Sequence, residues 1–584
     1  MPSAKERVEL RFQETQWRGN RLCAPNQENT YLPPKKDMSV RKSKLFTACA
    51  SALALALSAN FVCSADTTDT SADARKTAEA RKKKDAKVAK GPTGATPAPA
   101  AQPYGKKVNE YWWQRLNEAY AEQSATPVFV PPKPGDPPAP VRRIGPPPFD
   151  GPPYPTQEWQ LGGGPNIIGD PGALRDAPYP LMQAIYDGPS GEAWYNSRIQ
   201  LYGWVTVSGN ISTSHNTGPS QVTNYPEVYD ERGNRVENDQ DVLYIERMAD
   251  ENQTDHVDWG FRIALLYGLD YRFMASRGYI NDHNLFIANK FSGFDTPMLY
   301  GNIYIPWVAQ GMNIIIGRII SLPDIEQQLA PNNLMASHSL VYSFDNYTMW
   351  GIWTATKLNK NWVLQLGLAS GVDTAPWAYN LHEPGCEPTG SVNIQYIDSG
   401  GHDSFYVGMN SFNKGNFGFN NLQECIESYT HKFNEIVWTT FEVQYMWTNG
   451  CTTEPTTNVP IEDGFYPTHS GRAWTGGIVN YTCFRLANNA FLTVRNEYWD
   501  DPDGYRSGYS SPYSEHAIGI TWWPNKLLVI RPEIRFEHCY KTNGLESASG
   551  NDNSTGAPTT MYGAYDNGTR TSQVTFAIDA TFHF

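Results

Sequence analysis

Apolar and polar residues alternate with a period of two along most of the C-terminal part of the chain, as in β-strands that bury one face. At the C-terminus, apolar Val574, Phe576 and Ile578 alternate with polar neighbours. The segments 259–267 and 526–538 repeat the pattern, and arginine and glutamate fill the polar face of the second one. Ionised side chains in a row need water or partners, and the interior of a wide transmembrane barrel supplies both. A soluble β-sandwich shows the same alternation, so the pattern alone leaves both folds open.

The spacing of the alternating segments is more specific than the alternation itself. Working back from the C-terminus, we count about sixteen strands over 198–584, joined in turn by tight turns such as 359–360 and long polar loops such as 539–570. An even strand number, with short turns at one end and long loops at the other, is typical of bacterial outer-membrane barrels with both termini in the periplasm. We therefore predict an all-β fold, namely a transmembrane antiparallel up-and-down β-barrel.

The N-terminal part of the chain contains a sorting signal. An apolar stretch that follows basic residues lies within 38–65, and we interpret this segment as a signal peptide cleaved before Asp66. Residues 1–37 would then be an untranslated or non-native extension, with translation starting at Met38. The alternatives are a membrane anchor and a lipoprotein that carries its lipid on Cys63.

Residues 66–197 are first rich in lysine and alanine and then in proline, and we expect them to form a disordered extension in the periplasm. Roughly half of the 43 prolines lie between 92 and 180, where they favour a semi-rigid spacer. The basic cluster 81–84 is either simply solvated or contacts the cell wall. One short amphipathic helix is predicted over 108–123, with these residues near one face: Tyr111, Trp112, Leu116 and Tyr120.

Composition narrows the function further. The mean hydropathy of −0.51 excludes a bundle of transmembrane helices, whereas half-polar strands with long loops produce such a value. Aromatic residues make up 13% of the chain, as membrane-interface belts at the strand ends require. The formal net charge of −13 argues against a nucleic-acid partner.

Several segments of the predicted barrel resemble a known family. DVLYIER (241–247), WGFRIALLYGLDYRF (259–273), GMNIIIGRIISL (311–322), APNNLMASHSLVYSF (330–344) and TATKLNKNWVLQLGL (354–368) are similar to the OmpL-like β-barrel porin-2 family of bacterial outer-membrane proteins. The resemblance covers roughly 198–584 and implies a pore with no catalytic residues to carry over. Phe584 resembles the C-terminal aromatic residue that the outer-membrane barrel assembly machinery recognises as an insertion signal. Analogy with general porins suggests a homotrimer.

The resemblance also suggests where the pore narrows. By the strand count, 320–347 connects the fifth and sixth strands, which resembles the position of the constriction loop inside general porins. This loop carries Asp324, Glu326, Asn332, Asn333, His338 and Asp345. Alternation places arginines on the lumen face, with Arg318 at the root of the loop: Arg198, Arg262, Arg495, Arg531 and Arg535. Acids facing arginines would create a transverse field that orients dipolar solutes. Alternatively, the arginines only pair with wall glutamates as lumen filling: Glu442, Glu497, Glu533 and Glu537.

We therefore predict an outer-membrane porin for passive diffusion of small hydrophilic solutes or ions. The rivals are a secreted or surface-bound β-sandwich that binds polysaccharide, a carbohydrate-selective porin whose aromatic residues stack on sugars, and an enzyme built on a barrel. The chain shows no nucleophile, phosphate-binding or dinucleotide motif, and its histidines are not spaced as metal ligands, so we expect neither catalysis nor a cofactor.

The cysteines that follow the predicted signal peptide are odd in number: Cys386, Cys425, Cys451, Cys483 and Cys539. In an oxidising compartment this leaves at least one free thiol unless another chain pairs with it. We consider a disulfide between Cys386 and Cys425 a hypothesis.

Overall fold

The computed structural model describes residues 104–105, 111–125 and 178–584, except for short gaps in the last range. These gaps are 216–222, 248, 252, 275, 277, 281–283, 285–289, 321–323, 347, 378–387, 399–401, 414–421, 435, 452–470, 508–509, 542–547, 552–557 and 562–563. The predicted signal peptide, the basic cluster, most of the proline-rich segment and Cys386 lie outside the described residues. Cys425 is not disulfide-bonded.

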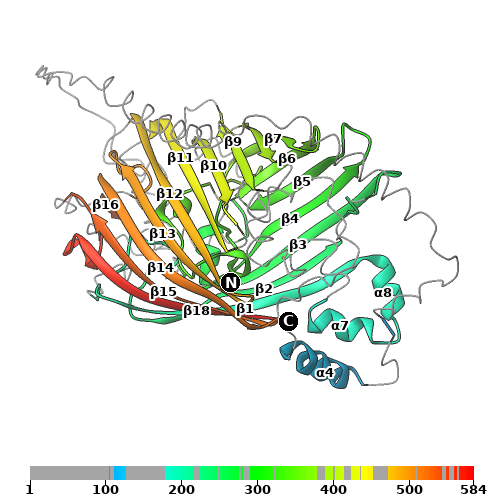
Figure 1. Cartoon of the computed structure of the whole chain (residues 1–584). Coiled ribbons are helices and arrows are strands. Elements are labelled where there is room, and N and C mark those ends of the chain that lie inside the picture. The colour runs from blue at the N-terminus through cyan, green and yellow to red at the C-terminus, as the bar shows by residue number, and fades with distance from the viewer. Residues whose placement is uncertain are drawn as a thin grey trace, which may run out of the picture. The chain divides into compact units, whose positions relative to one another are not determined.

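Sixteen antiparallel strands form one closed barrel, in which each strand pairs with its neighbours in sequence and β18 closes the ring on β1 (Figure 1). This confirms the predicted up-and-down barrel and excludes the β-sandwich. The short strands β16 (Ala548–Asn551) and β17 (Pro558–Met561) form a separate hairpin. The barrel strands are β1 (Ile199–Ser212), β2 (Val236–Arg247), β3 (Asp258–Gly268), β4 (Gly293–Ile305), β5 (Met312–Ile320), β6 (Thr348–Lys357), β7 (Trp362–Val372), β8 (Thr389–Ile397), β9 (Asp403–Phe412), β10 (Gln423–Lys432), β11 (Val437–Cys451), β12 (Gly471–Ala487), β13 (Ala490–Asp501), β14 (Ser511–Asn525), β15 (Leu528–Cys539) and β18 (Ser572–His583).

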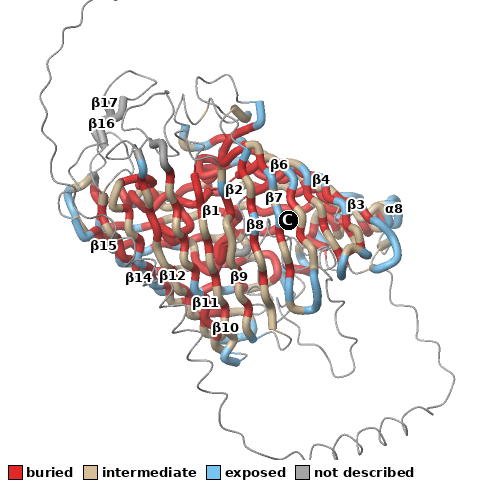
Figure 2. The backbone as a smooth tube through the Cα atoms, turned by 90° about the horizontal axis from the view of Figure 1, so that it is seen from above, coloured by how far each residue is buried: buried red, intermediate tan, exposed pale blue. Residues whose placement is uncertain are grey.

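The alternation along each strand separates an outward apolar face from an inward polar face, and Figure 2 shows it as alternating colours along the strands. In β18, Phe576 is 46% exposed while its neighbour Thr575 is fully buried. In β3, Trp259 and Tyr267 are exposed near the two ends of the strand, and Arg262 between them is buried on the inner face. A closed barrel leaves no unpaired strand edge, which is what the interior of a lipid bilayer demands.

The connections differ in length between the two ends of the barrel. One end, which we name the short-turn end, has tight turns such as 488–489 and 526–527. The other, the long-loop end, has long connections such as 213–235 and 540–571. The chain closes at the short-turn end, where the backbone N–H of Phe584 donates to Gly203 O at 2.9 Å.

Within the described residues before the barrel, the chain forms the helices α4 (Trp112–Ser124), α7 (Pro180–Tyr186) and α8 (Gly191–Ser197). They lie near the C-terminal residue in Figure 1, and α7 is packed against β1. Tyr179, immediately before α7, stacks on His583 of β18 with ring centroids 4.9 Å apart. The prediction of a disordered extension up to residue 197 is therefore wrong for 178–197, because this segment forms α7 and α8, and α7 is buried against the barrel. None of the helices among the described residues combines the length and apolar character that a membrane crossing requires.

The buried face of α4 differs from the predicted one. Tyr111 and Trp112 are exposed, and the buried residues are Arg115, Ala119 and Gln123. Of the predicted face, Tyr120 does pack against the barrel, where it stacks on Phe582 with ring centroids 5.8 Å apart. The reason for the difference is polar docking: Arg115 Nε donates to Ala184 O at 3.0 Å, a carbonyl that the last turn of α7 leaves without a helical partner. Helical periodicity ranks faces by hydrophobicity and misses such a contact.

Candidate functional site

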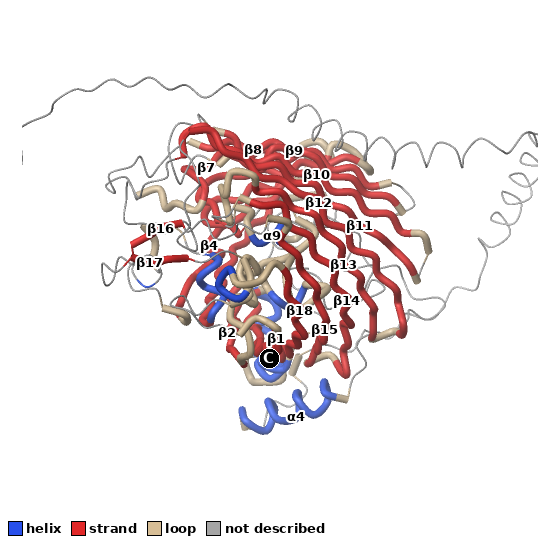
Figure 3. The backbone as a smooth tube through the Cα atoms, turned by 90° about the vertical axis from the view of Figure 1, so that its left-hand side faces the viewer, coloured by secondary structure: helices blue, strands red, loops and turns tan. Residues whose placement is uncertain are grey.

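The connection between β5 and β6, residues 321–347, folds back into the barrel, and we name it the lumen loop. Its described part contains the turn η4 (Ala330–Asn332) and the short helix α9 (Leu340–Ser343). Figure 3 shows α9 enclosed by the strands. Ser339 caps α9, since its side chain accepts a hydrogen bond from the backbone N–H of Tyr342. The loop leaves β5 and reaches strands on the far side of the ring.

Glutamates of the barrel wall accept hydrogen bonds from the backbone of the lumen loop. Glu442 of β11 accepts from Ile325 N at 2.8 Å, and Glu533 of β15 accepts from Ala336 N at 2.9 Å. Glu497 of β13 accepts from Leu340 N at 2.8 Å. Backbone N–H groups outside regular structure need acceptors once they are buried, and the first N–H groups of α9 have none within the helix. The wall carboxylates supply them.

Arginines of two strands and of the loop between β13 and β14 hold the carbonyl groups of the lumen loop. Arg495 Nη1 donates to Ser337 O at 2.8 Å, and Arg531 Nη1 donates to Asn333 O at 2.9 Å. Arg506 Nε donates to Phe344 O at 2.8 Å. Glutamates thus bind the N–H groups of the loop backbone and arginines bind its C=O groups. Together they fasten the loop inside the barrel.

The wall arginines also pair with wall acids. Arg495 lies 2.6 Å from Glu515, and Arg531 pairs with Asp579. Arg535 contacts Glu533 at 3.3 Å and Glu537 at 3.1 Å. Such pairing offsets part of the cost of burying the charges.

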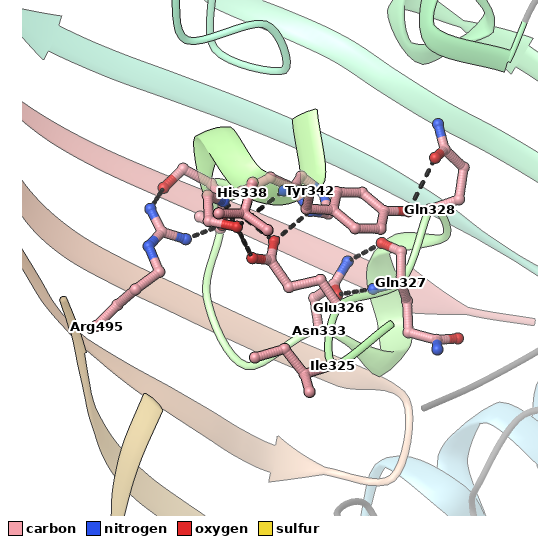
Figure 4. A network of polar contacts seen from close by, with 12 residues as sticks. Ile325, Glu326, Gln327, Gln328, Asn333, His338, Tyr342 and Arg495 are labelled. Atoms are coloured by element: carbon pink, nitrogen blue, oxygen red, sulfur yellow. Dashed lines mark hydrogen bonds and ion pairs between the residues drawn. The ribbon is translucent and has the colours of Figure 1, made fainter. Parts of the chain in front are cut away.

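Within the loop, Glu326 is held by its own neighbours (Figure 4). His338 Nδ1 lies 2.8 Å from Glu326 Oε2, and Ser339 N donates to Glu326 Oε1 at 3.1 Å. Burial raises the pKa of Glu326, but the hydrogen bonds from His338 and Ser339 outweigh it and hold the pKa below its usual value. Burial lowers the pKa of His338, so the imidazole is neutral near pH 7 and donates from Nδ1 to the carboxylate.

Asp324 lies in a different environment, among other carboxyl groups. Burial, followed by repulsion from Asp345 and Glu442, raises the pKa of Asp324 well above its usual value. Glu424 is close to the same group, where Asn346 Nδ2 donates to it at 2.6 Å. Asp324 thus faces carboxyl groups and not the arginines we expected opposite it.

The predicted site residues therefore divide into two sets. Arg495 and Arg531 contact the lumen loop. The others are engaged elsewhere: Arg262 pairs with Glu246 (2.6 Å), Arg318 with Asp295 (2.8 Å), Arg198 with Asp258 (2.6 Å), and Arg535 with wall acids and Asp230 (3.4 Å). Arg198 does not belong to the wall, because it ends α8 with a positive φ of 62° before β1 begins.

The proposed pairing of arginines with wall glutamates is correct only for Arg535, with Glu533 and Glu537. Glu442 and Glu497 accept from the loop backbone instead. Sequence reasoning missed Glu515, Asp579, Glu424 and Arg506. The first three occupy inward positions of strands, so alternation could have found them, whereas Arg506 belongs to a loop that has no such pattern.

Aromatic rings inside the barrel stack on one another. Tyr229 of the first long loop lies 4.0 Å from the His338 ring and 4.5 Å from Phe273, centroid to centroid. Phe344 stacks on Trp499 of β13 at 4.8 Å. These rings pack the loops against each other and against the wall. A carbohydrate-selective pore stays a prediction.

A small cavity lies between the lumen loop and the wall. Asp230, Asp239, Asp270 and Asp579 line it together with Arg531. Burial raises the pKa of Asp270 to about 8, although a hydrogen bond from Gln240 opposes the shift. The lining is therefore rich in carboxyl groups.

A closed barrel with an apolar outer face, a polar lumen and an inward-folded loop defines a class, the outer-membrane β-barrel of the porin type. Residues 198–584 match the family model described as "Putative beta-barrel porin-2, OmpL-like", and the chain belongs to this family. The resemblance seen in the sequence predicted this family, and the prediction is confirmed. Membership of the family assigns the chain to the outer membrane. Family and fold indicate a channel rather than an enzyme.

Similar folds occur among solved structures. The anion-selective porin from Comamonas acidovorans is 10% identical, with a TM-score of 0.42, and the match covers 66% of this chain and 99% of that one. The Vibrio cholerae outer-membrane protein OmpT is 7% identical (TM-score 0.39; 66% and 97% covered). The channel DcaP of Acinetobacter baumannii is 10% identical (TM-score 0.38; 66% and 97% covered). No curated protein matches the chain.

Proposed function

We propose that this chain forms a water-filled channel for passive diffusion of small hydrophilic solutes or ions across the outer membrane, with the lumen loop as its constriction. The observation that carries the proposal is the attachment of this loop to the wall. Glutamates and arginines of the wall, together with Arg506 of the loop between β13 and β14, hold its N–H and C=O groups from Ile325 to Asp345. A loop held at so many points keeps the cross-section of a pore constant, which a passive filter requires.

We further propose that the channel prefers cations. Asp324 lies with Asp345, Glu424 and Glu442, and acids also dominate the lining of the cavity. The wall arginines are engaged by wall acids and by backbone carbonyls, so their charge is largely compensated. Rings of acidic side chains favour cations in pores.

Conductance measurements in planar bilayers test both statements. We expect the folded barrel to form open channels and to conduct cations better than anions. Because burial and neighbouring acids raise the pKa of Asp324, Asp324→Asn should lower the ratio of cation to anion permeability at alkaline pH, where this carboxyl group is ionised. Glu427→Gln is the matched control, because it removes one negative charge from the outward face of β10 and should leave the ratio unchanged. A barrel that folds, as judged by heat-modifiable gel mobility, but does not conduct would overturn the proposed channel.

The short-turn end faces the periplasm in this proposal. Two features support it: the long loops gather at the opposite end, and the helices that precede the barrel pack at the short-turn end. Residues 66–197 would then lie in the periplasm, where their basic part can contact the cell wall. Phe584, paired with Gly203 at this end, is the proposed insertion signal for the barrel assembly machinery.

We also propose a homo-oligomer, of which a trimer is the expected form. A row of polar residues interrupts the apolar outer face near mid-height of three neighbouring strands. Asn480 of β12 is paired with Asn496 of β13, which is paired with His516 of β14. Asn496 Oδ1 lies 2.9 Å from His516 Nδ1. Lipid tails offer such groups no hydrogen bonds, whereas a second copy of the barrel does.

A further inference from the structure

Three buried glutamates meet where the first long loop folds against two neighbouring strands. Glu227 belongs to the loop between β1 and β2, Glu515 to β14 and Glu537 to β15. One carboxylate oxygen of each lies within 4.8 Å of the other two. All three side chains are fully buried. Residues distant in the sequence thus form one compact group of acids inside the barrel.

The strand register forces two of these acids together. Glu515 stands directly opposite Glu537, and both face the lumen. Like charges in this relation destabilise a sheet unless something compensates them. Arg495 binds only Oε1 of Glu515, and Arg535 binds only Oε2 of Glu537. Glu515 Oε2 and Glu537 Oε1 are left buried without a hydrogen bond.

Two further groups at this place are buried and unsatisfied. Glu227 has no hydrogen-bond partner on either carboxylate oxygen. The hydroxyl of Tyr565, from the last long loop, is also unpaired, and this residue interacts electrostatically with Glu537 and Glu515. Buried polar atoms normally have partners, because leaving them without one costs several kcal/mol in an apolar setting. Five oxygen atoms therefore lack a partner in one small region.

The nearby positive charge does not balance these acids. Arg535 is shared among Glu537, Glu533 and Asp230, and Arg495 is bound to Glu515. Glu227 has no ion pair of its own among the described residues. Carboxyl groups thus outnumber the arginines at this place, which leaves room for a cation.

We propose that Glu227, Glu515 and Glu537 bind a hard divalent cation of the calcium type, with Tyr565 beside it. Calcium takes oxygen ligands at about 2.3–2.6 Å, so two ligands of one ion lie no more than about 5 Å apart. The three carboxylates satisfy this span. The ligand group consists of oxygen atoms, which hard cations prefer and softer transition metals do not. The ion occupies the open oxygens and fastens the first long loop to β14 and β15.

Calcium binding to the folded full-length protein in detergent tests this site, with radiolabelled calcium in equilibrium dialysis. We expect one ion for each barrel, and a dissociation constant at least about tenfold higher for Glu227→Gln. Glu251→Gln is the matched control, since it also removes one buried carboxylate from the interior but lies between β2 and β3, where Asn313 donates to it at 2.9 Å. This control should bind calcium like the unchanged protein.

Other results of the same experiment would contradict the proposed calcium site. Absence of binding to a folded barrel, or equal loss in both variants, would show that the acids share protons or attract only a diffuse ion atmosphere. Competition by magnesium supports a divalent site, whereas displacement by moderate sodium chloride alone contradicts it. Heat-modifiable mobility checks that each variant folds. If Glu227→Gln does not fold, Glu227→Asp takes its place. This variant keeps the charge but shortens the side chain, and it should bind calcium more weakly. The result is independent of whether the barrel conducts.

Discussion

At the scale of single residues, Arg495 links three parts of the molecule. It lies on β13, pairs with Glu515 of β14 at 2.6 Å and donates to Ser337 of the lumen loop at 2.8 Å. All of these groups are buried. Its fork of donors serves a carboxylate and a carbonyl at once, which a lysine cannot reproduce.

Replacing this arginine should destabilise the barrel strongly. Arg495→Gln leaves the Glu515 carboxylate and the Ser337 carbonyl buried without their partner, and we expect the free energy of unfolding to fall by about 3–5 kcal/mol. Urea titration followed by tryptophan fluorescence measures the change. The control Arg570→Gln removes a surface arginine that pairs with Asp566 at 3.3 Å, and it should cost at most about 1 kcal/mol. Equal effects of the two substitutions would contradict the role assigned to Arg495.

Asp270 makes a pH-dependent contribution with a defined sign. Burial raises its pKa to about 8 in the folded protein, whereas an unfolded aspartate titrates near about 3.9. The folded state therefore holds a proton that the unfolded state has lost, and stability falls as the pH rises from about 4 to about 8. Asp270→Asn should remove this loss and raise the free energy of unfolding by about 1–3 kcal/mol at pH 8, with little effect at pH 4.

Urea titrations of the two proteins at a series of pH values measure this difference. The exposed Asp255 supplies the control, since Asp255→Asn should leave the profile of the unchanged protein intact. A difference between Asp270→Asn and the unchanged protein that does not vary with pH would show that Asp270 is ionised in the folded state.

At the scale of elements, the helices before the barrel show how tertiary contacts overrule composition. The segment 178–197 follows a proline-rich stretch and has no strong helical pattern, yet α7 is buried beside β1. Gln200 of β1 donates to the hydroxyl of Tyr186 at 2.7 Å, and Lys526 donates to Pro178 O at 3.1 Å. A helix of this length is unstable alone, so its partners account for its presence.

Removing one aromatic contact should therefore loosen this segment. Tyr179→Ala deletes the ring that stacks on His583 and lies 5.3 Å from Lys526 Nζ. We expect proteolysis between residues 178 and 197 to accelerate about tenfold or more while the barrel stays protected, because the local opening free energy falls by more than about 1.4 kcal/mol. Limited proteolysis with mass spectrometry measures the rate. Trp113→Ala, at an exposed ring of α4, should leave it unchanged.

At the scale of the whole molecule, the proposed oligomer depends on the outer face of the barrel. The polar row of Asn480, Asn496 and His516 is a poor match for lipid. Replacing all three by leucine should convert the oligomer to monomers, which light scattering in detergent measures. The control Ile518→Leu lies on the same face of β14 and should keep the oligomer. Assembly that survives the triple substitution would place the interface elsewhere.

The strands were predictable because their signal is local. A period of two over ten residues is visible without any knowledge of neighbours, and it correctly placed Arg262, Arg531 and Arg535 on the inner face. The strand count placed the connection 320–347 after the fifth strand, and the likeness to general porins suggested that it folds into the lumen. Arg198 failed because a positive φ ends α8 there, which alternation does not detect.

The contacts inside the barrel were not predictable in the same way. Arg531 bonds to Ala330, and Glu497 to Leu340, across sequence separations of 201 and 157 residues. No periodic pattern links such positions, because the loop follows its own path back into the lumen. The same reason explains why Asp324 lies among carboxyl groups although arginines lie on the wall.

The sequence by itself determined the barrel of this protein, its strand number and the inward or outward direction of side chains within the strands, since these depend on alternation and spacing along the chain. Only the tertiary structure decided what each lumen charge contacts, which residues before the barrel are folded, and where carboxylates gather. Closure of the ring and the return of the long loops bring distant residues together in a space with little water, where each buried polar group requires a specific partner.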